Sequence, residues 1–453
     1  MDNELTQHMH TTKQAEQTTC CIVGSGPAGA VLALLLARQG IAVTLLEQHL
    51  DFDRDFRGDT IHPSVMQIME ELDLADRLLQ LPHTKWYSYP PVQTAKGPFV
   101  IADFRRLKTR YPYMLLLPQA HFLAFITSEA KHFPHFQLVM GARAEQLIEE
   151  EGEIRGVHYR GQDGWHELRA KLTVGADGRF SRIRQLADFK PIQTSPPMDL
   201  LWFSLSRRPD DQEETSANVG KGHVLAMFSR GDTWQVADII PKGGYQQLRA
   251  AGLETLRQTI AQELPLLADR VEQLHAWKQV SVLSVEGSRL RRWYRLGLLL
   301  IGDAAHVMSP VGGAGINYAI QDAVVAANVL GERLKAGQVR LGDLAAVQRH
   351  REWPTRIIQT FQYTMQQQLL TRALTSDGLL TLSPFFLFLF RTPILRDMPT
   401  RFIAFGIWPV HVKHEARRRQ NQKRVGRWIA GIMTVLAIGQ IIRWIIRRLR
   451  HRS

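Results

Sequence analysis

Residues 302–317, GDAAHVMSPVGGAGIN, have the composition of a loop that binds a ligand through its backbone. They follow an apolar run at 298–301 that predicts a buried strand, and they lead into a helical pattern that starts near Ile316. Glycines between a strand and a helix bring backbone N–H groups against a ligand, and the start of a helix favours negative charge. The segment therefore predicts a site for a group that carries or develops negative charge.

A second glycine-rich turn, Gly24-Ser25-Gly26-Pro27-Ala28-Gly29, lies near the start of the chain. Residues 18–23 predict a buried strand before it, and residues 28–39 predict a helix after it. A further strand at 41–46 ends at Glu47. This is a β-α-β unit of about thirty residues, the context in which a GxGxxG turn binds a dinucleotide. Together the two turns predict one large cofactor held by distant parts of the chain.

Each residue type in the first turn has a specific use. Gly24 allows the tight turn, Gly26 lets a pyrophosphate approach the backbone, and Gly29 lets the helix pack close to the strand. Glu47 can accept hydrogen bonds from the ribose of an adenosine. The candidate dinucleotide-binding residues are Gly24, Gly26, Pro27, Ala28, Gly29 and Glu47.

The GxGxxG pattern alone does not separate FAD from NAD, and a tight structural turn is the alternative to dinucleotide binding. Its position at the N-terminus, together with the distant second site, favours a tightly held FAD. Glu47 also disfavours a 2′-phosphate at this site, because like charges repel.

Two further elements extend this pattern. Asp303 follows the strand at 298–301, where its carboxylate can bind a sugar or ribitol hydroxyl. Gly312, Gly313 and Gly315 expose N–H groups at the start of the next helix, which suits the charge that a reduced flavin carries at N1 and C2. A third motif, GADGRFSRIR at 175–184, also follows a predicted strand.

In the order GSGPAG, GADGRFSRIR and GDAAHVMSPVGGAGIN, the three motifs resemble those of the class A flavoprotein monooxygenases, over about residues 18–345. This family includes the aromatic-ring and ubiquinone-pathway hydroxylases with the para-hydroxybenzoate hydroxylase fold. The resemblance implies an α/β fold. A Rossmann-like FAD-binding domain of the GR2 type would carry an interleaved, mainly β substrate domain and a helical C-terminal region.

The resemblance also implies roles for single residues. Gly24, Gly26 and Gly29 would contact the FAD pyrophosphate, and Glu47 the adenosine ribose. Asp303 would bind the ribitol. The remaining implied contacts are Gly315, Ile316 and Asn317 at the flavin pyrimidine edge, Asp177 at the pyrophosphate and NAD(P)H, Arg57 near the pyrophosphate, and Gln119 on FAD.

Simpler interpretations stand beside these. Asp177 can be a helix N-cap, Arg57 a surface charge, and Gln119 a cap or surface residue. His306 suggests a catalytic base, but a structural role beside the flavin loop is the stronger interpretation. Pro310 is expected to shape the wall beside the ring.

The implied chemistry is carried by the flavin rather than by a side-chain nucleophile. NAD(P)H would reduce FAD, O2 would form a C4a-hydroperoxide, and one oxygen atom would pass to an apolar or aromatic substrate by hydroxylation or epoxidation. The protein must exclude water. Residues 191–285 are expected to cover the substrate, with these candidate lining residues, each of which can also be plain core: Trp202, Phe203, Phe228 and Trp234.

Other classes of flavoprotein remain as alternatives. Flavin-dependent halogenases carry a Trp-x-Trp-x-Ile-Pro signature, and residues 234–241 lack its second Trp. Reductases or dehydrogenases of isoprenoid or quinone-like lipids share the glycine-rich turns. In them the segment after GDAA usually lacks a histidine, whereas this chain has His306. The remaining alternative is a membrane-bound flavin-binding protein without turnover.

The pattern of elements divides the 453 residues into consecutive regions. They are a disordered leader (1–17), a first FAD-binding part (18–190), a β-sheet substrate domain (191–285), a second FAD-binding part (286–345), a helical region (346–410) and a tail (411–453).

The adjacent Cys20 and Cys21 are expected to point to opposite faces of one strand, so they predict no mutual disulfide and fit a reducing, cytoplasmic location. We expect no metal site.

Positive charge is concentrated in the tail. Of the net charge of +13, about +11 lies in 411–453, so the body is not expected to bind nucleic acid. Residues 428–442 form an apolar run with basic flanks that would span about 22 Å as a helix, short of the roughly 30 Å hydrocarbon core. We expect the tail to associate with a membrane surface or to span it briefly. The alternative is a buried packing helix. Membrane attachment would suit an apolar substrate such as a quinone, polyketide or terpenoid.

Overall fold

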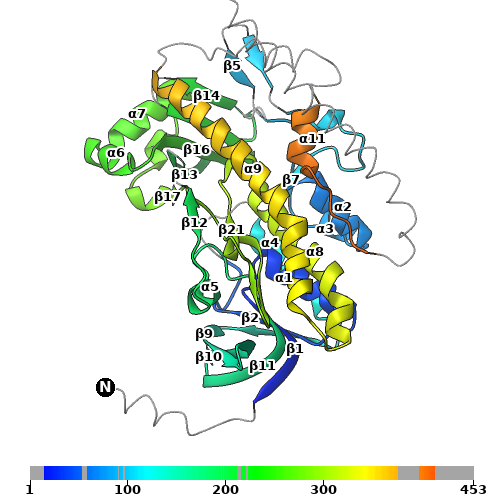
Figure 1. Cartoon of the computed structure of the whole chain (residues 1–453). Coiled ribbons are helices and arrows are strands. Elements are labelled where there is room, and N and C mark those ends of the chain that lie inside the picture. Colours follow the sequence, from blue (N-terminus) through cyan, green and yellow to red (C-terminus); the bar gives the residue numbers. More distant parts are fainter. Residues whose placement is uncertain are drawn as a thin grey trace, which may run out of the picture. The chain divides into compact units, whose positions relative to one another are not determined.

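The chain divides into two units, residues 1–410 and 411–453. The computed structural model describes residues 15–53, 59–89, 91–94, 97–100, 102–194, 196, 198–211, 216–220, 223–375 and 397–413. The helices and strands given below all belong to the first unit. Figure 1 shows their arrangement.

A mostly parallel sheet forms the centre of the FAD-binding part. Its order is β19-β20-β11-β1-β2-β8, and β10 and β9 extend it from β11. The neighbours from β20 to β8 run parallel, so their carboxyl ends meet at one edge. The strands are β1 (Glu16–Val23), β2 (Val43–Glu47), β8 (Phe136–Met140), β9 (Arg143–Glu150), β10 (Glu153–Gly161), β11 (Gly164–Gly175), β19 (Tyr294–Arg295) and β20 (Leu298–Leu300).

Helix α1 (Pro27–Arg38) contacts both α8 (Ala314–Lys335) and α4 (Gln119–Ala130). Ten of its twelve residues, from Ala28 to Ala37, are buried. This agrees with its sequence, PAGAVLALLLAR, which is apolar on nearly every face. The helix therefore packs between other elements and holds the glycine-rich turn at its start against the sheet.

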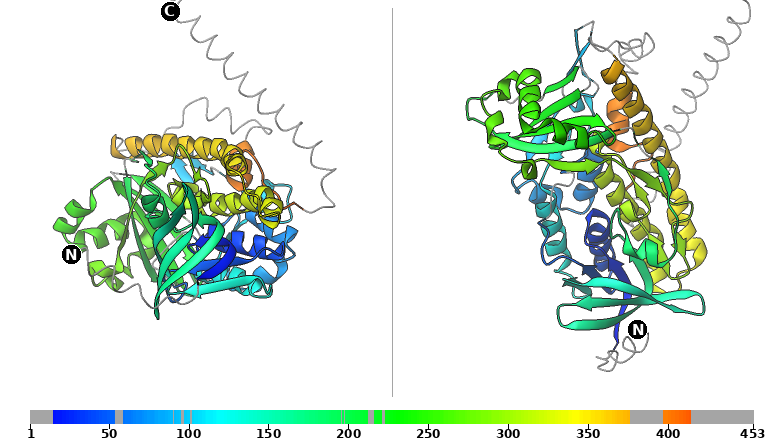
Figure 2. Two further views of the ribbon diagram at one scale, coloured as in Figure 1. Left: turned by 60° about the horizontal axis from the view of Figure 1, so that its bottom comes forward. Right: turned by 90° about the vertical axis from the view of Figure 1, so that its left-hand side faces the viewer.

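A second sheet lies beside the FAD-binding part, as the views of Figures 1 and 2 show. Its order is β17-β13-β16-β15-β14-β5-β6. The strands are β5 (Val92–Thr94), β6 (Gly97–Phe99), β13 (Met198–Ser206), β14 (Ser216–Gly220), β15 (His223–Arg230), β16 (Thr233–Pro241) and β17 (Ser281–Ser284). Two of them, β5 and β6, come from the segment expected in the first FAD-binding part. The sheet thus extends beyond the predicted range 191–285.

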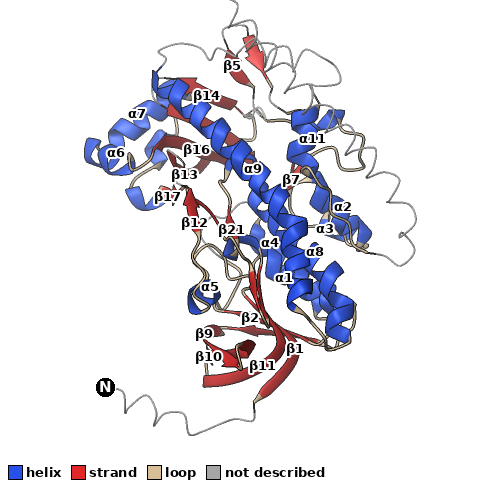
Figure 3. Cartoon of the chain, viewed as in Figure 1, coloured by secondary structure: helices blue, strands red, loops and turns tan. Residues whose placement is uncertain are grey.

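Two three-stranded sheets complete the described strands, which Figure 3 colours red. One pairs β12 (Ile192–Thr194), β18 (Gly287–Arg289) and β21 (His306–Val307). The other pairs β3 (Thr60–Ile61), β7 (Met114–Leu116) and β4 (Thr84–Trp86). The described part of the chain also contains short 3-10 turns: η2 (Phe104–Arg106), η3 (Pro265–Leu267), η4 (Val271–Gln273), η5 (Trp277–Gln279), η6 (Gly302–Ala304) and η7 (Val311–Gly313).

Two predicted helices are interrupted in the structure. The segment 62–79 forms α2 (Pro63–Glu71) and α3 (Ala75–Leu78), with Asp73 between them at φ 59°. The segment 245–269 forms α6 (Tyr245–Ala251) and α7 (Leu253–Glu263), separated by Gly252 at φ 97° and followed by η3. Periodicity predicted the helical character of both segments but not these breaks, because a left-handed residue between two helical runs leaves the period almost unchanged.

The helical region after residue 340 contains α9 (Leu341–Thr375) and α11 (Met398–Phe405). Helix α9 contacts α8 and β19 at one end and β14 and β15 at the other, so it spans both large sheets. Among the residues described, no helix combines the length and apolar character that a membrane crossing requires. Residues 1–14 of the expected leader (1–17) lie outside the described residues, whereas Glu16 and Gln17 already belong to β1, so the expected boundary is two residues too late. The Phe-rich segment 379–390 and the apolar run 428–442 also lie outside the described residues.

Candidate FAD and substrate site

The first two motifs meet where β1 and β11 end side by side. Gly24 has φ 99°, and a Cβ added to it would lie 2.6 Å from the carbonyl oxygen of Ala176. A Cβ on Gly29 would lie 1.9 Å from the carbonyl oxygen of Gly24, so only glycine lets α1 start this close to the strand. At Gly26 the nearest atom would be 3.9 Å away. The two crowded glycines shape the turn, and Gly26 leaves room beside it.

Glu47 ends β2 next to this turn. Its side chain is buried at 2% exposure, and its two oxygens accept hydrogen bonds from the N–H groups of Ser25 (2.9 Å) and His49 (3.0 Å). The carboxylate therefore braces the glycine-rich turn. Its contact with an adenosine ribose stays a prediction.

Asp177 lies in the turn between β11 and α5 (Arg182–Leu186). Its carboxylate accepts from the Ser181 hydroxyl at 2.5 Å and from the Ile183 N–H at 3.0 Å. Burial raises its pKa, and these hydrogen bonds oppose the rise only in part. Ser181 is the N-cap of α5 and accepts from the Arg184 N–H. The contacts resemble the capping alternative considered for Asp177, and its role toward FAD or NAD(P)H remains a prediction.

Arg184 links the second motif to the third, a role that the motif did not reveal. Its guanidinium donates to the carbonyl oxygens of Ala304 at 3.1 Å, Asp303 at 3.4 Å and Arg179 at 2.7 Å. The side chain is buried, and burial lowers its pKa while the carboxylates of Asp177 and Asp303 oppose that change. The only sequence signal was an arginine at the buried position of a short helix.

The third loop begins with Gly302 at φ 60° and forms the turn η6. A Cβ on Gly302 would lie 3.2 Å from the Cβ of Ala28 in α1 and 3.3 Å from that of Ala319 in α8. The glycine thus lets the two helices converge on the loop. Asp303 is more exposed than either of its neighbours, Gly302 and Ala304. This is the exposure that a ligand contact requires.

The loop at 310–317 is fastened from both sides by Asn317. Its side-chain amide donates to the carbonyl oxygens of Thr60 (3.0 Å) and Gly313 (2.9 Å) and accepts from the His62 N–H at 2.7 Å. Helix α8 begins at Ala314, two residues before the predicted start. A Cβ on Gly315 would meet nothing within 4 Å, whereas one on Gly313 would lie 2.1 Å from the Thr60 hydroxyl.

Several predicted site residues make contacts that hold the loop itself in place. The Asn317 amide is engaged as above, which leaves the backbone at Gly315 and Ile316 for the predicted flavin contacts. Pro310 precedes η7, and its carbonyl oxygen accepts from the Gly313 N–H at 2.9 Å. His306 is buried at 1% exposure, and its Nε2 lies 2.6 Å from Asp322. This buried contact favours a structural role for His306 over a role as a catalytic base.

His62 connects the loop to the C-terminal helix α11. Its Nδ1 lies 2.8 Å from the carbonyl oxygen of Ile403, and its ring is buried. Burial lowers the pKa of His62 to about 4, although backbone carbonyl groups of Ile403 and Gly312 act in the opposite direction. The imidazole is therefore neutral near pH 7, and it carries one N–H to donate.

Gln119 opens α4, and its N–H lies 3.3 Å from a carboxylate oxygen of Asp59. The other oxygen of Asp59 pairs with Arg230 of β15 at 2.6 Å. This ion pair joins the second sheet to the FAD-binding part, and burial raises the pKa of Asp59 despite it. Arg57 lies outside the described residues, so its role stays a prediction.

The second sheet presents an aromatic face toward the loop at 310–317. Trp202 and Phe228 stack with ring centroids 6.2 Å apart, and both belong to an apolar cluster that includes Val311. Phe228 also contacts Trp86 at 4.6 Å between centroids. Phe405 of α11 packs in the adjoining cluster around Trp86. Trp86 is 9% exposed, whereas Trp202, Phe228 and Phe405 are partly buried. Tyr89 packs against the same cluster as Trp86 and also lies beside the loop, near Gly312.

The other two expected lining residues lie on the opposite face, so that expectation is wrong for them. Phe203 and Trp234 are 2% and 0% exposed and pack beneath α7. Neighbouring residues of a strand point to opposite faces, so Trp202 and Phe203 cannot share one. The sequence contained both sets of aromatic residues but not the register that separates them.

Comparison with known proteins agrees with this geometry. Residues 17–357 match the family described as FAD binding domain. The chain is 33% identical over 414 residues to 6-methylpretetramide 4-monooxygenase of Streptomyces rimosus, which covers 91% of this chain and 98% of that protein. The chain therefore belongs to the class A FAD-dependent monooxygenases. It is an FAD-dependent oxidoreductase, a monooxygenase that uses NAD(P)H as co-substrate.

Solved structures confirm the fold. PqsL of Pseudomonas aeruginosa, solved with 2-aminobenzoylacetate, superposes with a TM-score of 0.68 at 21% identity and covers 79% of this chain and 98% of that one. The anhydrotetracycline hydroxylase OxyS of Streptomyces rimosus gives a TM-score of 0.68 at 20% identity over 86% and 76%. The predicted α/β architecture, with a parallel sheet and C-terminal helices, is confirmed.

The described residues fit FAD. Two positions, Gly26 and Gly315, leave room for a group to approach the backbone, and Gly315 is the second residue of α8. Asp303 lies on the loop whose carbonyl groups bind Arg184 of the second motif. Among the residues described, no three His, Cys, Asp or Glu side chains group as metal ligands. Both cysteines are free and buried, and desolvation raises the pKa of Cys20 to about 12.

Proposed function

We propose that this enzyme hydroxylates an extended, planar aromatic molecule held against the aromatic face of the second sheet. The observation that carries the proposal is the row of Trp86, Phe228 and Trp202 beside Val311 of the flavin loop. Flat aromatic surfaces favour offset or tilted stacking on a flat ligand. The 33%-identical relative, which this chain covers almost completely, is named 6-methylpretetramide 4-monooxygenase.

In this proposal the three loops bind FAD along its length. Gly24, Gly26 and Gly29 with Pro27 and Ala28 would receive the pyrophosphate, and Glu47 the adenosine ribose. The remaining proposed contacts are Asp303 on the ribitol, Gly315, Ile316 and Asn317 at the pyrimidine edge, Asp177 at the pyrophosphate and NAD(P)H, Arg57 near the pyrophosphate, and Gln119 on FAD. Bound FAD supplies the activation of O2 after reduction by NAD(P)H.

The chain's own residues position and shield this chemistry. Asn317 holds the loop whose N–H groups face developing negative charge at the start of α8. The apolar cluster around Val311 excludes water from the adjoining space. His62 is neutral near pH 7 and so adds no positive charge beside the loop.

The test is turnover by the purified, FAD-loaded protein. We expect NAD(P)H oxidation to rise with tricyclic and tetracyclic phenols more than with monocyclic phenols, terpenoids or quinones. With ¹⁸O2, the product should gain one ¹⁸O atom by mass spectrometry. An isoprenoid product that gains two hydrogens instead would support the reductase alternative. Oxidation that no compound stimulates would support the non-catalytic alternative, and either result overturns the proposal.

We also propose that residues 411–453 associate with an anionic membrane surface and place the enzyme on the cytoplasmic side. The support is the sequence of this tail, an apolar run at 428–442 between basic flanks. The full chain should co-sediment with vesicles containing phosphatidylglycerol, and a chain truncated after residue 410 should not. Equal binding by the two chains would show that the tail is not the anchor.

A further inference from the structure

A fully buried carboxylate lies behind the loop that carries Asp303. Asp322 of α8 has 0% side-chain exposure, as does Arg351 of α9, and the two are joined by a 2.7 Å contact between Nε and Oδ1. The other oxygen, Oδ2, accepts from the Gly302 N–H at 3.0 Å and lies 2.6 Å from Nε2 of His306. The first and last residues of the loop 302–306 thus bind one carboxylate oxygen.

The charge of this group is retained despite its burial. Burial alone would raise the pKa of Asp322, but His306 and Arg351 together hold it below its usual range. The carboxylate is therefore ionised at neutral pH, and Arg351 balances its charge. The His306 ring is itself held by Trp293, with ring centroids 4.8 Å apart.

The middle of the same loop is held from the opposite side. Arg184 donates to the carbonyl oxygens of Asp303 and Ala304, while Asp322 accepts from Gly302 and His306. A buried cation thus binds loop carbonyls and a buried anion binds loop donors. The backbone of Gly302, Asp303 and Ala304 is held in this way, and with it the position from which the Asp303 side chain starts.

A buried ion pair is weak support for stability, because apolar residues of similar volume often serve as well. Here, however, one oxygen of the pair makes both of its contacts with a single five-residue loop. Helix α8 also carries Asn317, which fastens the second glycine-rich loop. One rigid helix therefore holds both loops at a fixed separation, about 7.5 Å of helical rise from residue 317 to 322.

We propose that Asp322 is the positioning residue for the ribitol-binding loop, and that Arg351 balances its buried charge and holds its carboxylate in place. The inference rests on the proposed role of Asp303. We therefore expect the loss of Asp322 to weaken FAD binding even in a variant whose melting temperature is restored.

The experiment compares four variants of the FAD-loaded, full-length protein: Asp322→Asn, Arg351→Met, the double variant, and the control Asp343→Asn. Asp343 pairs with Arg333 at 3.3 Å and joins the same two helices away from the loop. The FAD dissociation constant is measured from the recovery of flavin fluorescence on dilution. The melting temperature is measured at saturating FAD.

Asp322→Asn should weaken FAD binding at least tenfold, about 1.4 kcal/mol, and Asp343→Asn should leave it within twofold. Both single variants at the buried pair should melt earlier. The double variant removes both charges, so its melting temperature should recover toward that of the wild type while FAD binding stays at least tenfold weaker. A double variant whose FAD affinity recovers together with its melting temperature would overturn the proposal.

If Asp322→Asn does not fold, Asp322→Glu supplies the answer. It keeps the charge for Arg351 but displaces the carboxylate, so FAD binding should still weaken at least tenfold, and wild-type binding would overturn the proposal. Asp303→Ala separates the two assignments. If Asp303→Ala leaves FAD affinity unchanged, the proposed role of Asp303 is wrong. If Asp303→Ala weakens FAD binding but the double variant of Asp322 and Arg351 does not, only the proposed role of Asp322 is wrong.

Discussion

The two faces of the second sheet differ although the same strands build them. One face packs beneath α7 and holds Phe203 and Trp234 at 2% and 0% exposure. The other carries Trp202 and Phe228, which remain partly buried and lie near Val311 of the flavin loop. Adjacent residues of β13 thus serve a closed core beneath α7 and a partly buried aromatic surface.

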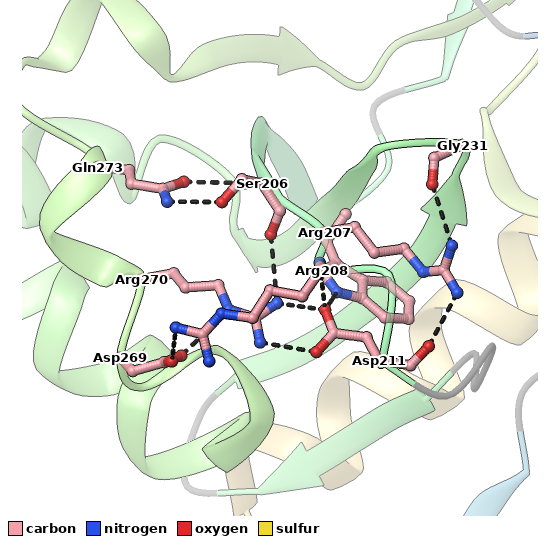
Figure 4. Close-up of polar contacts among 9 residues, drawn as sticks. Ser206, Arg207, Arg208, Asp211, Gly231, Asp269, Arg270 and Gln273 are labelled. Carbon is pink, nitrogen blue, oxygen red and sulfur yellow. Dashed lines mark hydrogen bonds and ion pairs between the residues drawn. The ribbon is translucent and has the colours of Figure 1, made fainter.

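The closed face is also completed by polar contacts, shown in Figure 4. Asp211 binds the Arg270 guanidinium through both oxygens and accepts from the Trp234 indole N–H (2.9 Å) and the Arg208 N–H (2.9 Å). The Asp211 and Arg270 side chains are only 5% and 4% exposed. The contact fixes the chain that leaves β13 against the segment after α7. The difference indicates that the face beneath α7 maintains the sheet, and the proposed function assigns the other face to the substrate.

The largest effect is expected from Phe203→Ala. It removes a buried ring from the closed face and should lower the free energy of unfolding by about 3–5 kcal/mol. Chemical denaturation of the FAD-loaded protein measures this loss. The matched control is Trp202→Ala, one residue earlier on the other face. A loss of equal size at both positions would contradict the comparison.

Asp211→Asn should have a smaller but clear effect on the same face. Among the described residues, it leaves the buried Arg270 with only the ion pair of its Nε to Asp269 at 3.1 Å, so the melting temperature should fall by several degrees. FAD affinity should not change, because the residues of Figure 4 belong to the second sheet and the segments around it. Differential scanning calorimetry and flavin fluorescence test the two statements. Weaker FAD binding would show that the closed face acts on the cofactor.

Trp202→Ala and Phe228→Ala should act on the substrate rather than on the fold. Each removes a stacking surface worth about 0.5–1.5 kcal/mol beyond its buried area, so KM should rise roughly threefold to tenfold. The melting temperature should change little. Steady-state kinetics at saturating NAD(P)H measure the effect. An unchanged KM with a large loss of stability would assign these rings to the core.

The smallest effect is the pH response of the closed face. Arg270 lowers the pKa of Asp211 well below its usual range, so this pair contributes stability above the unfolded value near pH 4. That contribution is lost only as the pH falls through the lower folded pKa. Between pH 7 and pH 5 the difference in melting temperature between wild type and Asp211→Asn should therefore stay constant. A difference that vanishes in this range would contradict the assigned charge.

Much of the site could be predicted from the sequence because its signals are local. GxGxxG between a strand and a helix predicted the turn at 24–29, and Gly24 has the positive φ that such a turn requires. The burial of α1 follows from its continuous apolar sequence. Arg184 and Asp322 could not be assigned in this way, because their partners at 303–306 and 351 come from other elements. An acidic residue on the apolar side of α8 was the one available signal for Asp322.

The sequence by itself determined the three motifs, the β-α-β unit, the family and therefore the cofactor, since each depends on residues within a few positions of one another. The tertiary structure decided which residues hold the motifs together and which aromatic face of the second sheet lies beside the flavin loop. A shift of one residue in a strand exchanges its two faces, and composition does not contain that register. Contacts between Asp322, Arg351 and the loop at 302–306 exist only because two helices and a parallel strand converge at one place.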